Sequence, residues 1–192
     1  MLKKIGIYGG TFDPIHHAHL ILAREALEVL RLDKIIFVPA AIAPHKLSQP
    51  AAPAPVRFEM VRVAIADEHG FALSSCELDR AAPSYSIDTV RQLQADDSSA
   101  EFYFLLGEDN VTELHAWHEI DILKQMVNFV VLDRTGLETE HSFKIIRRHV
   151  DISATDIRKR VATGRSIRYL VPAAVEEIIH REKLYQESND HP

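Results

Sequence analysis

Short apolar runs rich in β-branched residues alternate along this chain with longer stretches in which apolar residues recur every three or four positions. The first pattern is typical of buried strands and the second of amphipathic helices. Strands are predicted at residues 4–8, 34–38, 71–75, 101–106 and 127–132, with a further candidate at 143–152, and helices at 17–30, 56–68, 87–94 and 173–183. This alternation predicts an α/β domain: a doubly wound, mainly parallel sheet with helices on both faces and a C-terminal helical segment.

Two segments interrupt the alternation. Residues 39–55 are rich in proline, with Pro39, Pro44, Pro50, Pro53 and Pro55. So many prolines disfavour a helix or a central strand and predict an exposed loop, of a length that in compact domains often binds ligands. The other segment, residues 186–192, is a polar tail. The chain has 192 residues, which suits one domain, and we expect that domain to span residues 1–185.

Charge and composition narrow the class of protein. The formal net charge of -6 disfavours non-specific binding to nucleic acid, which depends on clustered Lys and Arg. Cys76 is the single cysteine, so no intramolecular disulfide can form, as is usual in a reducing compartment. Too few residues precede Gly9 for a signal peptide, and no apolar run is long enough to cross a bilayer. We therefore expect a cytoplasmic protein that binds neither nucleic acid nor a membrane.

The clearest candidate for chemistry is the turn after the first predicted strand. Gly9 and Gly10 let a ligand approach the backbone closely, and the helix that follows offers unpaired N–H groups and the positive end of its dipole. His16 and His19 are three residues apart at the start of this helix, so both imidazoles can face the same side and donate hydrogen bonds to phosphate oxygens. Together these features predict a phosphate-binding site.

Two other interpretations of this turn stay open. Gly9 and Gly10 also suit a tight strand-to-helix turn that binds no ligand. The imidazoles of His16, His17 and His19 suit a zinc ion. However, neighbouring side chains on a helix point in different directions, and no Cys or further spaced His completes the set.

The turn resembles a known signature. Residues 9–14, Gly-Gly-Thr-Phe-Asp-Pro, followed by His16-x-x-His19, resemble the motif of the class I nucleotidyltransferase superfamily, which ends in His-x-Gly-His. Ala18 stands where that motif has glycine. Alanine is the smallest replacement, so we expect the helix still to pack closely against the sheet. The resemblance implies a Rossmann-like fold that binds ATP.

Further segments narrow the resemblance to bacterial nicotinate-mononucleotide adenylyltransferases and extend it over nearly the whole chain. Two positions depart from that family's pattern, since Ser86 replaces threonine and Thr135 replaces proline. The matching segments, in the family's order, are Pro44-His45-Lys46, Glu77-Leu78-x-Arg80, residues 84–89, Gly107-x-Asp109, Trp117, Arg134-Thr135-Gly136, residues 152–158 and Leu170-Val171-Pro172.

This resemblance implies transfer of AMP from ATP to nicotinate mononucleotide, which gives nicotinate adenine dinucleotide and pyrophosphate on the way to NAD. The nucleophile is a phosphate oxygen that is anionic near neutral pH, so the reaction needs no general base. Catalysis is then expected from alignment of the two substrates and from stabilisation of charge at the α-phosphate. ATP is a substrate, Mg²⁺ is expected to bind through phosphate oxygens, and no side-chain metal ligands are expected.

The resemblance also assigns roles by position. The expected catalytic residues are His16, His19 and Arg158. The expected ATP-binding residues are Gly9, Gly10, Thr11, Phe12, Lys46, Gly107, Asp109, Ser153 and Thr155. The expected acceptor-binding residues are His45, Tyr85, Ser86, Trp117 and Arg134.

Taken singly, several of these residues also have a purely structural interpretation. Asp109 follows a glycine at the end of a strand, where a carboxylate either accepts from ribose hydroxyls or caps a helix. Ser153 and Arg158 suit an anion cradle or, equally, a capped helix with a surface arginine. Trp117 suits stacking on a pyridine ring or packing in the core.

Other functions also stay open. Pantetheine-phosphate and glycerol-phosphate nucleotidyltransferases share the first motif, although residues 84–89 and Trp117 disfavour both. A nicotinamide-mononucleotide acceptor is a nearer alternative. A catalytically silent nucleotide-binding or regulatory module is disfavoured by the presence of His16, His19 and Arg158 together. An RNA-binding fragment related to class I synthetases fits poorly with the net charge of -6.

Overall fold

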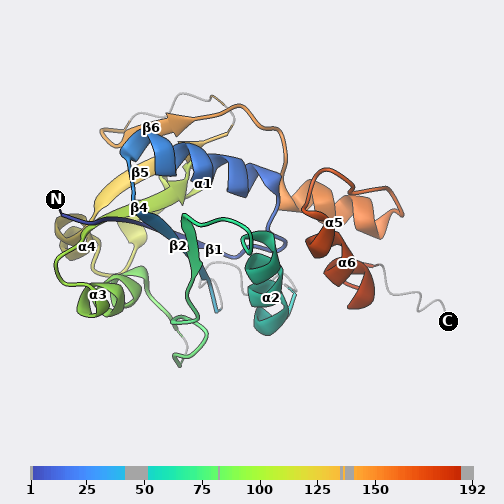
Figure 1. The fold of residues 1–192 in the computed structure, drawn as a ribbon, viewed down its shortest axis with the longest axis horizontal. Coiled ribbons are helices and arrows are strands. Elements are labelled where there is room, and N and C mark those ends of the chain that lie inside the picture. The colour runs from blue at the N-terminus through green and yellow to red at the C-terminus, as the bar shows by residue number, and fades with distance from the viewer. Residues whose placement is uncertain (1, 42–51, 82, 135, 137–140, 187–192) are drawn as a thin grey trace.

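The computed structural model describes residues 2–41, 52–81, 83–134, 136 and 141–186 (Figure 1). Its strands are β1 (Lys4–Gly10), β2 (Lys34–Pro39), β3 (Phe71–Leu73), β4 (Glu101–Gly107), β5 (Asn128–Asp133) and β6 (Lys144–Arg147). Its α-helices are α1 (His17–Leu30), α2 (Ala54–Ala64), α3 (Ser86–Asp96), α4 (Ile120–Met126), α5 (Ala154–Ala162) and α6 (Ala173–Arg181). Two short 3₁₀ helices, η1 (Glu108–Asn110) and η2 (Leu114–Ala116), follow β4.

All the described strands form one parallel sheet in the order β3-β2-β1-β4-β5-β6. The predicted α/β fold is therefore confirmed, and the sheet is parallel throughout rather than mainly parallel. Strand order reverses between β1 and β4, where the chain crosses from one half of the sheet to the other. Ligands of open α/β sheets bind at the carboxyl ends of the strands at such a point.

The core lies on both faces of the sheet because side chains alternate along each strand. On β1, Ile5 and Ile7 pack on the face covered by α3 and α4, while Tyr8 packs on the face covered by α1. Gly6 lies on the same face as Tyr8, where an added Cβ would approach Ile35 Cγ1 to 2.9 Å. Burial on both faces explains why these strands read as continuous apolar runs in the sequence.

The helices at the C-terminal end extend beyond the sheet. Helix α5 lies beside α6, and α6 packs on α2 (Figure 1). After α6 the chain turns back, and Tyr185 packs against the core on the side of α1. The exposed Gln186 is the last residue that the structure describes, so most of the predicted polar tail lies outside it.

The prediction of a proline-rich loop over residues 39–55 was wrong at both ends of that segment. Pro39 closes β2, Pro53 precedes α2 as its N-cap, and Pro55 lies in the first turn of α2. A proline is tolerated in the first turn of a helix because the N–H that it lacks would have no partner there. Residues 42–51, between these ends, lie outside the described residues. Within the part that is described, no helix has the length and apolar character needed to cross a membrane.

Candidate active site

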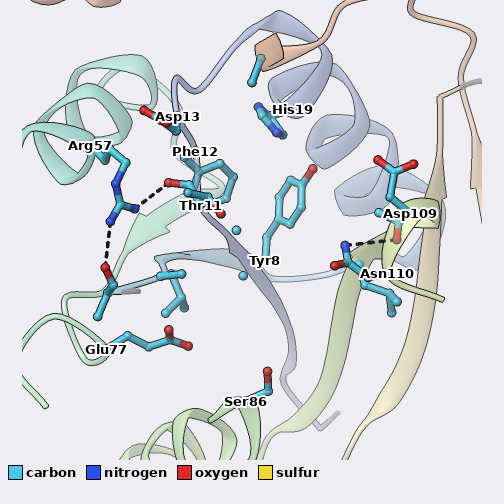
Figure 2. A pocket seen from close by; sticks show the side chains of 18 of the residues that line it. Tyr8, Thr11, Phe12, Asp13, His19, Arg57, Glu77, Ser86, Asp109 and Asn110 are labelled. Carbon is cyan, nitrogen blue, oxygen red and sulfur yellow. Dashed lines mark hydrogen bonds between the residues drawn. The ribbon is translucent and has the colours of Figure 1, made fainter. Parts of the chain in front are cut away.

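A pocket of about 1120 Å³ opens at the carboxyl ends of β1 and β4 (Figure 2). Its walls come from the glycine turn (residues 9–14), the start of α1, the first turns of α2, α3 and α5, and both 3₁₀ helices. The pocket is lined by all the expected catalytic residues, all the expected ATP-binding residues except Lys46, and all the expected acceptor-binding residues except His45. Lys46 and His45 lie outside the described residues. The fold thus brings together residues that are as far apart in sequence as positions 9 and 158.

Two glycines that line the pocket are not required by packing. At Gly10, an added Cβ would lie 3.0 Å from the ring of Phe12, which would have to shift to make room for it. At Gly9 the nearest atom to an added Cβ is 3.8 Å away, on Phe104, and at Gly107 it is 3.7 Å away, on Asn110. A side chain at either position would occupy the pocket itself. Gly9 and Gly107 therefore leave part of the pocket open next to the backbone.

His16 and His19 stand together at the start of α1. His16 is the N-cap, and its backbone N–H donates to His19 Nδ1 at 3.2 Å. The two rings stack with centroids 3.7 Å apart. Because His19 Nδ1 accepts a hydrogen bond, the proton of a neutral ring lies on Nε2, which can then donate to a ligand. His16 Nδ1 is buried and has no hydrogen-bond partner among the described residues, which is uncommon for a buried polar atom.

Both histidines are held neutral near neutral pH. Burial, assisted by the positive charge of Arg134, lowers the pKa of His16 to about 3. Burial also lowers the pKa of His19 well below its usual value, again with help from neighbouring His16 and Arg134. In the free protein the pair therefore offers hydrogen-bond donors rather than positive charge.

The buried histidines make stability depend on pH. Between the usual histidine pKa of 6.5 and the folded value of about 3, the unfolded chain binds a proton at His16 that the folded protein does not. We therefore expect the free energy of unfolding to be largest above pH 6.5 and to fall on acidification, by about 2 kcal/mol for His16 between pH 6.5 and pH 5. Urea unfolding at both pH values measures this loss. The His16→Gln variant should lose less of its free energy of unfolding between these pH values than the wild-type protein does. The His180→Gln variant, changed at an exposed position of α6, should lose as much as wild type. Equal losses in all three proteins would contradict the prediction.

The start of α5 forms the wall beside the glycine turn. Ser153 caps this helix by accepting from the N–H of Asp156 at 3.1 Å, which confirms the predicted N-cap. Arg158 is more than a surface arginine, because its Nη1 donates to the carbonyl of Asp13 at 2.7 Å. Its Nη2 lies 3.4 Å from Thr155 Oγ1. Arg158 thus ties α5 to the turn and still has N–H groups to offer to an anion.

Arg134 and Asp109 form one unit, although the sequence suggested separate roles. Arg134 donates to the carbonyl of Ile152 at 2.8 Å and pairs with Asp109 at 3.4 Å. The Asp109 side chain is 82% exposed and belongs to η1, whose N-cap is Gly107, so the interpretation of Asp109 as a cap was wrong. Arg134 lies close enough to lower the pKa of both histidines, which places its charge at the histidine end of the pocket.

Aromatic residues gather around the start of α3. Tyr85 is the N-cap of α3 and Ser86 its first residue. The Tyr85 ring stacks on His118, with centroids 4.3 Å apart. Trp117 meets Phe104 of the core edge-on at 5.7 Å and also lines the pocket, so core packing alone does not account for it. Tyr85 makes no side-chain cap hydrogen bond to the first N–H groups of α3, which lie at this wall of the pocket.

Three polar residues of the pocket had no assigned role in the sequence. Asp13 and Arg57 are both buried, and Arg57 points from α2 toward Thr11 (Figure 2). Glu77 accepts a hydrogen bond from Thr89 at 2.9 Å, and burial raises the pKa of its carboxyl group. No local pattern marked Arg57, because a helical arginine is usually exposed.

The structure also bears on the zinc interpretation. No three side chains of His, Cys, Asp or Glu within the described part of the chain lie close enough to one another to hold a metal ion. His16 and His19 stack instead of converging on a common point.

Comparison with known proteins agrees with the geometry. Residues 7–160 match the family model described as cytidylyltransferase-like. A protein of Geobacillus thermodenitrificans, named probable nicotinate-nucleotide adenylyltransferase, is 44% identical over 187 residues, which covers 96% of this chain and 87% of that one. A protein of the same name from Shouchella clausii is 41% identical over 194 residues, or 98% of this chain and 100% of its own.

Solved structures show the same fold. The Plasmodium falciparum nicotinic acid mononucleotide adenylyltransferase complexed with NaAD superposes with a TM-score of 0.80 at 20% identity and covers 95% of this chain and 97% of that one. A Vibrio parahaemolyticus structure described as a putative nicotinate-nucleotide adenylyltransferase superposes with a TM-score of 0.71 at 20% identity and covers 97% of this chain and 98% of that one. Given the extent of the family match and the identity to the bacterial relatives, the chain belongs to the cytidylyltransferase-like family, in the group of nicotinate-nucleotide adenylyltransferases.

Proposed function

We propose that this protein transfers AMP from ATP to nicotinate mononucleotide and releases pyrophosphate. The observation that carries the proposal is that one pocket holds both donors for phosphate, at the glycine turn, and aromatic residues, at the start of α3. Nucleotide pockets of this kind occur at the reversal point of parallel sheets. The two bacterial relatives described above are named probable nicotinate-nucleotide adenylyltransferases, which agrees with this proposal.

The reaction is a displacement at the α-phosphorus of ATP. A phosphate oxygen of nicotinate mononucleotide forms the new P–O bond, the bond to the bridging α,β oxygen breaks, and pyrophosphate leaves with that electron pair. His16 and His19 would donate to the α-phosphate oxygens, where negative charge must be stabilised. Arg158 and the free N–H groups at the start of α5 would hold the outgoing phosphates. Arg134 would hold the phosphate of the acceptor and so align the nucleophile.

We propose that Mg²⁺ accompanies ATP. With no cluster of metal-ligating side chains among the described residues, the ion would be held by phosphate oxygens, which is common for Mg²⁺. When bound, it would neutralise charge on the leaving pyrophosphate. We expect chelation of divalent cations to abolish turnover and added Mg²⁺ to restore it, with pyrophosphate release as the measurement. Full turnover in excess chelator would contradict a role for the ion.

Product analysis tests the proposed function. Purified protein is mixed with ATP, Mg²⁺ and nicotinate mononucleotide, and the dinucleotide and pyrophosphate are quantified. Phosphopantetheine and glycerol 3-phosphate serve as control acceptors, and CTP as a control donor. Product formed only with a control substrate would identify a sibling activity. ATP binding without product from any acceptor would indicate a silent nucleotide-binding module instead.

We also propose that the catalytic unit is a single domain that ends at Tyr185. Tyr185 packs on the core that α1 and α6 share, whereas the exposed Gln186 follows it directly. A reaction that consumes ATP would place this domain in the cytoplasm.

A further inference from the structure

Arg57 is a buried cation whose hydrogen bonds all run to backbone carbonyls. Its side chain belongs to α2, and only 3% of the residue is exposed. Nε donates to the carbonyl of Ala52 at 2.9 Å, Nη1 to Thr11 at 2.7 Å, and Nη2 to Ala41 at 3.0 Å. A buried guanidinium is stable only when its N–H groups are satisfied. Here three carbonyl oxygens surround the planar guanidinium group and accept hydrogen bonds from its three nitrogens.

The three carbonyls belong to parts of the chain that are separate in sequence. Thr11 is in the glycine turn, while Ala41 and Ala52 border residues 42–51 on either side. Arg57 therefore fixes the distance between these two borders and holds both against the turn. Figure 2 shows its hydrogen bond to Thr11, and both residues line the same pocket as His19.

Asp13 completes the arrangement from the other side. Its carboxylate accepts from the N–H of Ala52 at 3.1 Å and from the hydroxyl of Tyr185 at 2.6 Å. Its carbonyl accepts from Arg158. Ala52 is thus held twice, through its carbonyl by Arg57 and through its N–H by Asp13. We call Asp13, Arg57 and Tyr185 the turn anchor.

We propose that Arg57 is a positioning residue for AMP transfer, which holds the glycine turn in place through the carbonyls of Thr11, Ala41 and Ala52. This inference rests on the proposed function. Arg57 acts through the backbone it binds and not on the reacting phosphates. Movement of the turn by a fraction of an ångström displaces the donors of His16 and His19 from the α-phosphate, and small misplacements of this kind slow catalysis strongly.

The test compares Arg57→Lys with Arg62→Lys. Lysine at position 57 keeps the positive charge beside Asp13 but cannot reach three acceptors with a single ammonium group. Arg62 is on the same helix, exposed, and paired with Glu59, so its replacement is a matched control. We expect kcat at saturating ATP to fall about tenfold to a hundredfold in Arg57→Lys and to stay unchanged in Arg62→Lys.

Two further measurements separate positioning from simple destabilisation. Rates are taken well below the melting temperature of each variant, where a purely structural role predicts a normal kcat per folded molecule. Tyr185→Phe removes one hydroxyl of the turn anchor without a change of shape, and we expect about a threefold to tenfold loss of kcat, an effect of one hydrogen bond. Tyr169→Phe, at a residue that is 77% exposed, is its control.

Calorimetry measures the ATP affinity of each variant and so gives a result that does not depend on the proposed reaction. A wild-type protein that forms no dinucleotide would refute the proposed function, yet ATP binding weakened in Arg57→Lys and not in Arg62→Lys would still support the anchor. Normal kcat and normal ATP affinity in folded Arg57→Lys would overturn the inference. Should Arg57→Lys fail to fold, Tyr185→Phe decides: a kcat equal to that of wild type overturns the inference as well.

Discussion

Replacement of His19 by alanine is expected to lower kcat by about a hundredfold to a thousandfold, with the fold intact. His19 is fixed by the hydrogen bond from the backbone of His16 and by stacking on the His16 ring. Its free Nε2 is therefore preorganised, and removal of one preorganised donor from a transition state has an effect of this size. His16→Ala should act in the same direction.

His17→Ala is the control for this prediction. His17 shares the first turn of α1 and the same chemistry, but it does not line the pocket. We expect its kcat to remain near that of wild type. Circular dichroism and melting curves of all three variants establish that they are folded, and single-turnover rates report the chemical step. A folded His19→Ala protein with near-normal turnover would reject the donor role.

The second large effect is expected in the choice of acceptor. We expect kcat/KM for nicotinate mononucleotide to exceed that for nicotinamide mononucleotide by about tenfold to a hundredfold. A carboxylate only accepts hydrogen bonds, whereas a carboxamide also presents an NH₂ group that needs an acceptor. The uncapped start of α3 offers N–H groups and the Ser86 hydroxyl, which suit the carboxylate.

The side chain of Glu77 opposes this preference for nicotinate mononucleotide. Its carboxylate lines the same pocket, can accept from an NH₂ group, and would repel an anion when ionised. Burial raises the pKa of Glu77, which reduces that repulsion. The Glu77 carboxylate also accepts a hydrogen bond from the hydroxyl of Thr89. Comparison of kcat/KM for both acceptors in wild type and in Ser86→Ala measures the preference, and equal values in wild type would overturn it without affecting the AMP-transfer assignment.

The fold could be predicted from the sequence where the pattern of apolar residues matches the burial of their side chains. Helix α1 was predicted residue for residue, because its apolar stripe and the glycine turn before it mark both the face and the start. Strands β1 and β4 were found because burial on both faces gives continuous apolar runs. The strands at the two edges of the sheet, β3 and β6, were predicted too long. Ser74 and Ser75 follow β3, and the apolar Val150 and Ile152 follow β6, so the residue pattern alone does not mark where strand pairing ends.

The candidate site was predictable only in its local motifs. The glycine turn, the histidine pair and the Ser153 cap each occupy a few consecutive positions, so residue spacing reveals them. The turn anchor joins Asp13, Arg57 and Tyr185, which no local pattern connects. The pairing of Arg134 with Asp109 was missed for the same reason. Contacts of this kind depend on the packing of the complete fold.

The contact between Tyr185 and Asp13 has a consequence for how the enzyme is made. It joins positions 172 residues apart, so it closes nearly the whole chain into one loop. During synthesis the glycine turn therefore emerges long before Tyr185, which is 172 residues further along the chain. A nascent chain can form β1 and α1 early, yet the turn gains its final support only once Tyr185 has been made. We therefore expect ribosome-bound chains that stop before Tyr185 to hold ATP more weakly than the released protein does.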